Sequence, residues 1–565
     1  MKIRVFGQPL LFISLAISAF CETPRGLVYY RPVERGEPKT LEFDVAVYGG
    51  TPGGFASALQ SARLGKNVVL LSFNQHVGGL TSGGLTATDV GKKTAIGGLA
   101  MEFYNRVGAL RDFRPSHAET TFRKMLEEAG VTILFERPLE SVAMEKTRIS
   151  SITLETGETI KAAVFVDATY EGDLFAAANV SYHIGREPSA HYDEKIGGQW
   201  QNILWQSVYQ FCDLPVSPYI DPEDPNSGLL PGISPLPYGK PGDGDHRIQA
   251  YNFRMFLSDK EDRLPFPKPA DYQPGRYALL ARFMNSGATI DWTLDYTIKP
   301  MTDGPVQLRN GDSNNAGSMS SNNVNGSNFW PDGTFEAVNF SKLPPPRRGL
   351  ALPLRELYQL RERIYQDHVS YQQGYMYFLA NDPQVPASLR KRVNRFGLDA
   401  KEFAPTGHWP HALYIREGRR MLGDYVMTQA DCESKRAAQD PVGLASYPMD
   451  SHPCQRVAVS RNGVTVVRNE GAFGSPALKP YPISYRAIVP KPSECENLIV
   501  PVCLSSSHVA FGSIRMEPVY MILGQSAGVI ASMTIDRKSA VQDLPYEKLR
   551  EQLLILGQVL HAESR

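Results

Sequence analysis

The residues best suited to acid–base chemistry lie late in the chain, between positions 408 and 456. Asp450 and His452 are two residues apart, so in an extended segment their side chains would point to the same face. A carboxylate beside an imidazole fixes the tautomer of the ring and raises its basicity, which suits a base that removes a hydroxyl proton. His408 is a second candidate for this base, and Arg416 could hold an anionic group or stabilise an oxyanion.

The same residues also allow a structural interpretation. His408 stands next to Trp409, and Arg416 follows Tyr414 closely. Histidine and arginine side chains beside aromatic rings often form structural networks where two domains meet. The sequence alone leaves both interpretations open.

A glycine-rich turn near the start of the chain indicates where a cofactor could bind. Val45–Tyr48 is predicted to be a short buried strand, a helix is predicted from Phe55, and a second apolar strand follows at Asn67–Leu71. Strand, glycine turn, helix and strand form the βαβ unit that holds the pyrophosphate of a dinucleotide. Glycines let the backbone approach the phosphates, and the helix N-terminus offers N–H donors. The predicted contacts in this turn are Gly49, Gly50, Thr51, Pro52, Gly53 and Gly54.

The turn departs from the full dinucleotide signature at two positions. Thr51 occupies the middle glycine of G-x-G-x-x-G, and Ser72 stands where an acidic residue would bind the ribose hydroxyls. For this segment alone, an ordinary α/β unit without a ligand is therefore the alternative.

A second glycine cluster, Gly78–Gly84, favours FAD over NAD as the cofactor. A plain NAD domain has no need of glycines here, whereas an FAD domain uses them to bring the chain close to the extended cofactor. His76 could add a charge or a hydrogen bond near the pyrophosphate, or it could be a surface loop residue. The predicted FAD contacts of this region are Ser72, His76, Gly78, Gly79, Leu80, Thr81 and Ser82.

The segments that follow complete a predicted nucleotide-binding domain. The pattern predicts one helix and four strands, at Ala118–Ala129, Val131–Phe135, Leu139–Ala143, Ile149–Leu154 and Ala163–Asp167. Asp167 and Asp173 either cap the next helix or position the cofactor. The predicted contacts here are Ala168, Thr169 and Asp173.

Near the C-terminus the sequence predicts a strand, a loop and a helix. Asn497–Cys503 is the strand, Leu504–Met516 is the polar loop, and Pro518 is expected to begin the helix. A loop that leads into a helix N-terminus can stabilise negative charge on the pyrimidine end of a reduced flavin. The predicted contacts are His508, Gly512, Ser513 and Ile514. Arg515 is the charged residue expected beside the flavin, unless it pairs only with Glu517.

The middle of the chain differs from both flanks. The patterns predict a surface loop at Pro215–Pro241, a strand at Ile248–Leu257 and helices at Pro274–Ser286 and Pro353–Ala380. Asn310–Trp330 is rich in Asn, Ser and Gly. Its amides, with the rings of Phe329 and Trp330, would suit a hydroxyl-rich ligand, and a solvated linker is the alternative.

Taken together, the motifs resemble those of exported FAD-dependent oxidoreductases of the glutathione-reductase-like superfamily. They include YGGTPGG, HVGGLTSGGL, DATYEGDL, YPMDSH and SSSHVAFGSIRMEPVYMILGQSAGVIA, and the resemblance spans nearly the whole mature chain. It implies bound FAD and an α/β fold, in which a Rossmann-like FAD-binding domain is split by a large inserted α+β substrate domain. The expected segments are a signal peptide at 1–21, FAD-binding domain at 42–180 and 481–538, substrate domain at 181–480, and a C-terminal helix or tail at 539–565.

The composition indicates a soluble protein with balanced charge. Its 565 residues include 59 basic and 59 acidic side chains, and no basic run is present, which argues against nucleic acid as a partner. Lys2 and Arg4 precede the apolar stretch Leu10–Cys21, which is typical of a secretory signal, an uncleaved anchor being the alternative. We expect an exported, periplasmic or secreted protein with no other segment that spans a membrane. The sequence contains no metal-ligand spacing.

The expected reaction is hydride transfer between flavin N5 and a small-molecule substrate. Relatives in the resembled family are often exported proteins near carbohydrate-degrading functions, so the resemblance implies a sugar or sugar derivative. Two alternatives are a redox-neutral FAD enzyme, such as a lyase or isomerase, and a non-catalytic glycan-binding protein that has lost FAD.

Overall fold

A computed structural model describes most of the chain. The described residues are 26–85, 88–111, 113–200, 213–214, 216–286, 298–299, 307–308, 327–334, 341–343 and 346–561. The expected signal peptide at 1–21 and the Asn-rich stretch 310–326 lie outside them.

The largest sheet is parallel at its centre, as the predicted α/β fold requires. Its strand order is β3-β2-β1-β6-β5-β4, and β22 pairs with the end of β6. The pairs β1–β2, β1–β6, β2–β3 and β6–β22 are parallel, whereas β4–β5 and β5–β6 are antiparallel. The strands are β1 Lys39–Tyr48, β2 Val68–Leu71, β3 Thr132–Leu134, β4 Leu139–Glu145, β5 Arg148–Leu154, β6 Glu158–Asp167 and β22 Leu498–Ile499. A segment from near the end of the chain therefore joins strands formed by its first part.

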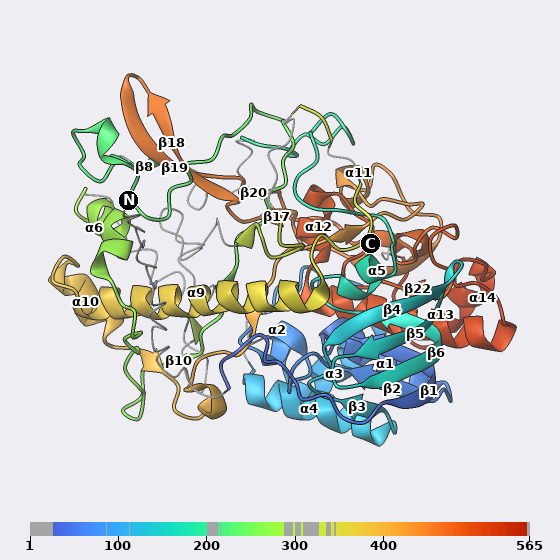
Figure 1. Ribbon diagram of the computed structural model, residues 1–565. Coiled ribbons are helices and arrows are strands. Elements are labelled where there is room, and N and C mark those ends of the chain that lie inside the picture. The colour runs from blue at the N-terminus through green and yellow to red at the C-terminus, as the bar shows by residue number, and fades with distance from the viewer. Residues whose placement is uncertain are drawn as a thin grey trace, which may run out of the picture.

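Helices cover this sheet, and α13 (Glu517–Arg537) packs directly on α1 (Pro52–Arg63). A Cβ at Gly528 would lie 2.7 Å from the carbonyl oxygen of Ser57, so glycine permits this close approach. By length and apolar composition α13 could cross a membrane, but 89% of its apolar window is buried, as in the core helix of a soluble protein. α13 also contacts α3 Gly98–Val107 and α14 Tyr546–Ile555, whereas α4 Pro115–Glu128 packs on α1 and α3 (Figure 1).

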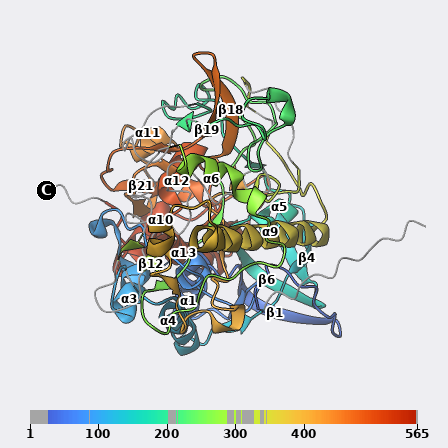
Figure 2. The same cartoon turned by 90° about the vertical axis from the view of Figure 1, so that its left-hand side faces the viewer.

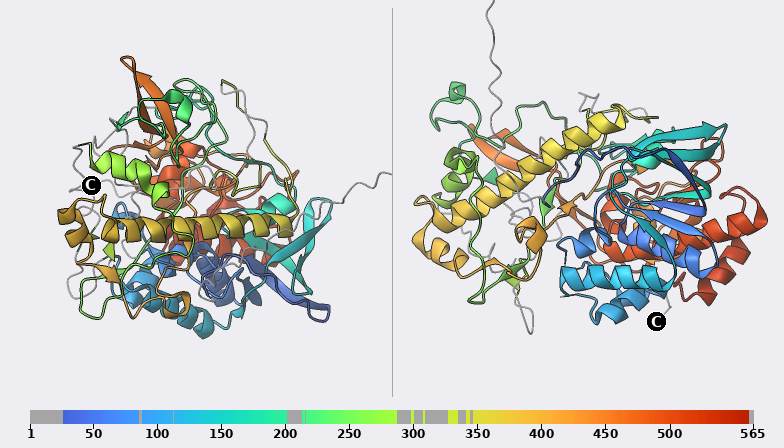
Figure 3. Two further views of the ribbon diagram at one scale, coloured as in Figure 1. Left: turned by 60° about the vertical axis from the view of Figure 1, so that its left-hand side comes forward. Right: turned by 60° about the horizontal axis from the view of Figure 1, so that its bottom comes forward.

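The long helix α9 (Leu354–Asn381) connects the sheet to the rest of the molecule. It begins beside β4, where the Tyr358 hydroxyl donates to the Leu139 carbonyl at 3.1 Å, and it runs toward α10 (Figures 1 and 3). The hairpin of β18 (Gln455–Arg461) and β19 (Val464–Glu470) projects at the end opposite the sheet (Figure 2).

The remaining elements are short. The helices and 3₁₀ turns are α2 Gly79–Ser82, η1 Lys93–Ala95, α5 Asp173–Ala177, η2 Pro225–Ser227, η3 Pro274–Tyr277, α6 Ala278–Met284, α10 Ala387–Val393, η4 Ala404–Thr406, α11 Gln429–Cys432, η5 Tyr485–Ala487 and α12 His508–Ile514. The strands are β7 Tyr182–His183, β8 Asp213–Leu214, β9 Asn252–Phe253, β10 Leu257–Ser258, β11 Ile298–Lys299, β12 Gln307–Leu308, β13 Gly397–Leu398, β14 Leu413–Tyr414, β15 Arg420–Met421, β16 Pro441–Ala445, β17 Asp450–Ser451, β20 Phe473–Gly474 and β21 Tyr481–Ser484.

Two predicted segments were wrong in detail. The predicted loop Leu504–Met516 contains the helix α12, because the Ser507 hydroxyl caps it by accepting from the Ala510 N–H, and all its residues are buried. The predicted strand Ile248–Leu257 is extended only at β9 and β10, since each pairs with a partner of two residues. Its apolar pattern reflects complete burial rather than a sheet face.

Candidate functional site

The first glycine turn is built so closely that side chains would not fit. Gly49 has a φ of +117°, and a Cβ there would lie 2.6 Å from the backbone of Ala168 at the end of β6. A Cβ at Gly54 would collide with the carbonyl oxygen of Gly49. Thr51 caps α1, since its hydroxyl accepts from the Gly54 N–H at 3.2 Å and donates to the Ala168 carbonyl at 2.7 Å. Thr51, which replaces the middle glycine of the motif, therefore connects the turn to the end of β6 by a hydrogen bond.

The second glycine cluster lies against the first. The Gly78 N–H donates to the Gly50 carbonyl at 2.7 Å, and both Gly78 and Gly79 have positive φ. A Cβ at Gly79 would collide with the Tyr170 hydroxyl, which accepts from the Leu80 N–H at 3.0 Å. Both glycine clusters, together with the side chain of Tyr170, border the same passage.

Two adjoining cavities open at this passage, at the carboxyl ends of β1, β2 and β6. The first has a volume of about 100 Å³, and the second, of about 500 Å³, shares several of its lining residues. A glycine-rich turn beside two adjoining cavities fits an extended dinucleotide such as FAD. The predicted contacts that line the first cavity are Gly49, Gly50, Thr51, Ser72, His76, Gly79, Thr169 and Asp173.

Other predicted contacts lie behind this lining. Ala168, Leu80, Thr81 and Ser82 are buried, and the Thr81 hydroxyl donates to Glu517 at 2.9 Å. Pro52, Gly53 and Gly54 form the first turn of α1, and Gly78 precedes α2.

The polar side chains around the cradle mostly contact one another. Ser72 donates to the His76 carbonyl at 2.8 Å, and the His76 ring stacks on His411 with 3.5 Å between ring centroids. His76 Nδ1 also lies 3.1 Å from Glu119. These contacts hold the chain between β2 and α2 in place.

The two aspartates after β6 both have structural partners. The Asp167 carboxylate accepts from the Phe175 N–H at 2.9 Å and so caps α5. Asp173 forms buried ion pairs with Arg361 and Arg419, each at 2.6 Å.

Several lining residues carry no sequence motif and were missed. Tyr29 and Tyr30 come from the segment before β1, which is held because both N–H groups donate to Glu362 on α9 at 2.8 Å. Tyr29 lines both cavities, and its hydroxyl donates to Glu171 at 3.2 Å. The suggestion that the Trp330 ring could stack on a hydroxyl-rich ligand is wrong. This ring is fully buried against Tyr29, so it offers no face to a ligand.

Glu171 yields a testable pH dependence. Burial raises its pKa to about 7, and Asp173 adds to this effect while Arg361 and the Tyr29 hydroxyl oppose it. Because the folded pKa exceeds the unfolded value, the stability this group contributes is complete below about pH 4.5 and is lost as the pH rises through about 7. We expect Glu171→Gln to remove that loss and to stabilise the cofactor-free protein at about pH 8.5 by on the order of 3 kcal/mol.

Urea unfolding at about pH 5 and about pH 8.5 measures the effect. Glu127→Gln on the exposed face of α4 is the control, and its two free-energy differences should both lie near zero. A Glu171→Gln difference that is the same at both pH values would contradict the prediction.

The predicted acid–base pair is brought together in a second polar cluster. His452 Nε2 lies 3.5 Å from the Asp450 carboxylate, and Arg515 contacts the same carboxylate at 3.2 Å. Arg515 also donates to the Tyr414 hydroxyl at 2.9 Å. Within the described residues Arg515 does not pair with Glu517, which instead accepts from Thr81 and Tyr170.

The electrostatics of His452 differ from the sequence-based expectation. Burial, together with the charges of Arg416, Arg515 and Arg254, holds the pKa of His452 well below its ordinary value. The expected rise in basicity from Asp450 is therefore not found. The imidazole is neutral at physiological pH, and the surroundings that keep it neutral also oppose the positive charge that it gains with a proton.

This cluster lies next to the second glycine cluster. Tyr414 packs with Leu80 and Leu85, which flank Gly83 and Gly84. A Cβ at Gly84 would collide with the carbonyl oxygen of Arg254. The acid–base residues are thus attached to the region that follows the cofactor cradle.

Of the two other candidates, only Arg416 belongs to this cluster. Its guanidinium lies 4.4 Å from the Tyr414 ring centroid and donates to the Ala250 carbonyl and to Asn252. His408 is half-buried elsewhere, with Nδ1 3.0 Å from the Glu402 carbonyl.

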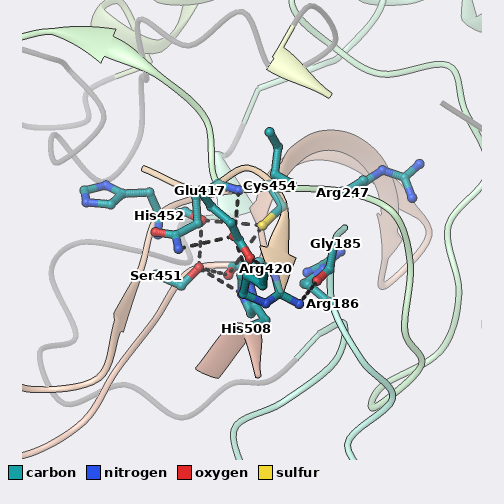
Figure 4. A network of polar contacts seen from close by, with 12 residues as sticks. Gly185, Arg186, Arg247, Glu417, Arg420, Ser451, His452, Cys454 and His508 are labelled. Atoms are coloured by element: carbon teal, nitrogen blue, oxygen red, sulfur yellow. Dashed lines mark hydrogen bonds and ion pairs between the residues drawn. The ribbon is translucent and has the colours of Figure 1, made fainter. Parts of the chain in front are cut away.

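A buried network fixes the strand β17, which carries Asp450 and ends one residue before His452. His508 Nδ1 lies 2.9 Å from Glu417, and Nε2 lies 3.3 Å from the hydroxyl of Ser451, the residue between them (Figure 4). Arg420 pairs with Glu417 and, at 2.7 Å, with Glu187. The His452 ring points away from this network (Figure 4).

The predicted flavin contacts of α12 lie against this strand. A Cβ at Gly512 would lie 2.5 Å from the Asp450 carbonyl oxygen, and Ser513 donates to the Tyr447 carbonyl. Ile514 is part of the core. Together with His508, these residues support β17 from behind.

Comparison with known protein families gives a match over most of the chain. The model of the family described as FAD dependent oxidoreductase matches residues 44–553.

Similarity to solved structures covers about a quarter of the chain. THI4 of Thermovibrio ammonificans is 21% identical, with a TM-score of 0.20 and coverage of 24% of this chain and 59% of that one. The 3-ketosteroid-delta4-(5alpha)-dehydrogenase of Rhodococcus jostii RHA1 is 15% identical, with a TM-score of 0.18 and coverage of 24% and 47%. The OxyS anhydrotetracycline hydroxylase of Streptomyces rimosus is 14% identical, with a TM-score of 0.21 and coverage of 26% and 36%. The match spans less than two thirds of each of these proteins.

Proposed function

Because this chain belongs to the family of FAD-dependent oxidoreductases, we propose that it oxidises or reduces a C–O bond of a small, carbohydrate-like molecule, with His452 as the proton-transfer residue. The cofactor is FAD, which when bound would supply hydride exchange with a substrate carbon at flavin N5. One observation carries the proposal: Asp450, His452 and Arg515 lie together beside the second glycine cluster.

The glycine turn and the residues after β2 would hold the cofactor. Gly49–Gly54 and the N-terminus of α1 suit the pyrophosphate, because glycines let the backbone come close to a phosphate and the helix N-terminus offers N–H donors. Ser72, His76 and the segment Gly78–Ser82 would continue the contact. We assign the FAD-binding domain to 42–180 and 481–538, since β22 pairs with β6 and α13 packs on α1.

His452 would move the proton that accompanies the change at the C–O bond. The Asp450 carboxylate lies 3.5 Å from its Nε2 and would orient the ring. The imidazole would accept the hydroxyl proton when an alcohol is oxidised to a carbonyl and return it in the reverse direction. The neutral state of the ring is the state that this role requires.

A hydroxylated substrate suits the side chains of the cluster. Asp450 accepts hydrogen bonds and Arg515 donates them. Small polyols and sugars need such a mixture of donors and acceptors.

An anaerobic screen tests the proposal. The purified protein is expected to be yellow with bound flavin, and a sugar or sugar derivative should bleach it persistently. Conversion of the sugar while the flavin stays oxidised at the end would favour the redox-neutral lyase or isomerase. A colourless protein that cannot be reconstituted with FAD would favour the non-catalytic alternative.

A further inference from the structure

One arginine in the polar cluster is buried without forming an ion pair. Arg254 lies between β9 and β10 in the chain and is only 4% exposed. Within the described part of the chain its side chain forms no hydrogen bond or ion pair, and its Nε is buried without an acceptor. Arginine stays charged in proteins, so the fold carries the desolvation cost of a cation that no direct ion pair offsets.

The surroundings of Arg254 hold more positive than negative charge. Its guanidinium lies 5.0 Å from the Tyr414 ring centroid, and that of Arg515 lies 5.8 Å from the same ring. Asp450 is the carboxylate of this cluster, and it already pairs with Arg515. Asp89 acts on Asp450 from further away and lies 3.9 Å from Arg111.

The position of Arg254 is fixed, and solvent reaches the cluster. Its backbone carbonyl is held against Gly84 of the second glycine cluster, and its charge is felt at both Asp450 and His452. The Asp450 side chain is 27% exposed, which provides a route for a small molecule. A preorganised guanidinium next to an acid–base pair has the fork geometry that binds a carboxylate with two hydrogen bonds.

We propose that the substrate is an acid, whose carboxylate is bound by Arg254 while a neighbouring hydroxyl faces His452. Sugar acids and other small hydroxy acids have this chemistry. The inference rests on the proposed function, because it names the substrate class of the same site.

The test compares acids with their neutral parents on the FAD-loaded protein. Glucuronate, galacturonate, gluconate and malate are titrated by calorimetry and by perturbation of the flavin spectrum, with glucose and galactose alongside. We expect at least one acid to bind and the neutral sugars to bind at least tenfold more weakly. Arg254→Met should weaken acid binding about tenfold, the loss of one charge-assisted pair, and Arg254→Lys should restore part of it.

Thermal unfolding distinguishes a binding role from a structural one. Without ligand, Arg254→Met should be at least as stable as the wild type, because it removes an uncompensated buried charge. Arg148→Met, at an exposed ion pair on β5, is the control and should leave acid binding unchanged. Destabilisation by Arg254→Met, with acid binding retained, would make Arg254 a structural residue and overturn the inference.

Binding and redox readouts separate this inference from the proposed function. Acids that bind through Arg254 without reducing the flavin would support the anion site and contradict the redox reaction. Reduction of the flavin by neutral sugars, with no acid binding, would support the redox reaction and contradict the anion site. Failure of every acid to bind the wild-type protein would overturn the anion site.

Discussion

The His452→Asn protein should keep its fold and its FAD but reduce the flavin on the order of a hundredfold more slowly than the wild type. Asparagine preserves polarity and approximate size, but it cannot accept the hydroxyl proton. The structure supports this choice because the ring faces Asp450 and is kept neutral by burial and nearby arginines. Stopped-flow measurement of flavin bleaching, with the reducing compound found in the anaerobic screen, gives the rate.

The comparison requires a control and a partner variant. His117→Asn on the exposed face of α4 should reduce at the wild-type rate. Asp450→Asn should slow reduction less than His452→Asn does, because it removes the orienting group and leaves the proton acceptor. If the His452→Asn protein reduces its flavin at the wild-type rate and saturates normally with substrate, His452 does not transfer the proton and its role is structural.

Gly54→Val should abolish stable FAD binding, with a flavin content below about a tenth of that of the wild type. Even the first carbon of a side chain collides with the Gly49 carbonyl, so the turn must open and the cradle is lost. Flavin absorbance per mole of purified protein measures the effect, and circular dichroism reports whether the fold is kept.

Gly275→Val is the matched control for this change. A Cβ at Gly275 meets no atom within 4 Å, so this variant should keep its flavin. Should Gly54→Val fail to fold, Gly50→Ala provides a milder test, because its Cβ would lie 2.8 Å from the Ser72 hydroxyl oxygen. Stoichiometric flavin in a folded Gly54→Val protein would contradict the assignment of this turn to the pyrophosphate.

The sequence predicted those parts of the site whose geometry is local. β1, the glycine turn and α1 are consecutive, and Asp450 and His452 come together because one residue separates them in the chain. Such arrangements follow from spacing alone.

Other parts depend on contacts that no spacing encodes. Tyr29 reaches the cavity because Glu362 on α9 holds its segment, and Arg254 stands in an apolar run that resembles a strand. The helix α12 was missed because its cap, Ser507, is the last of three serines and its glycine favours a loop.

The pairing of β22 with β6 also sets the order in which the protein can mature. Residues 498–499 pair with 165–166, and α13 covers the face of α1 that carries the glycine turn. Until the ribosome has supplied residues 498–537, this face has no partner and its apolar surface is open to chaperones and to aggregation. Closing so long a loop makes formation of the cradle a late folding step. We therefore expect a nascent chain to capture FAD only after β22 and α13 have been synthesised.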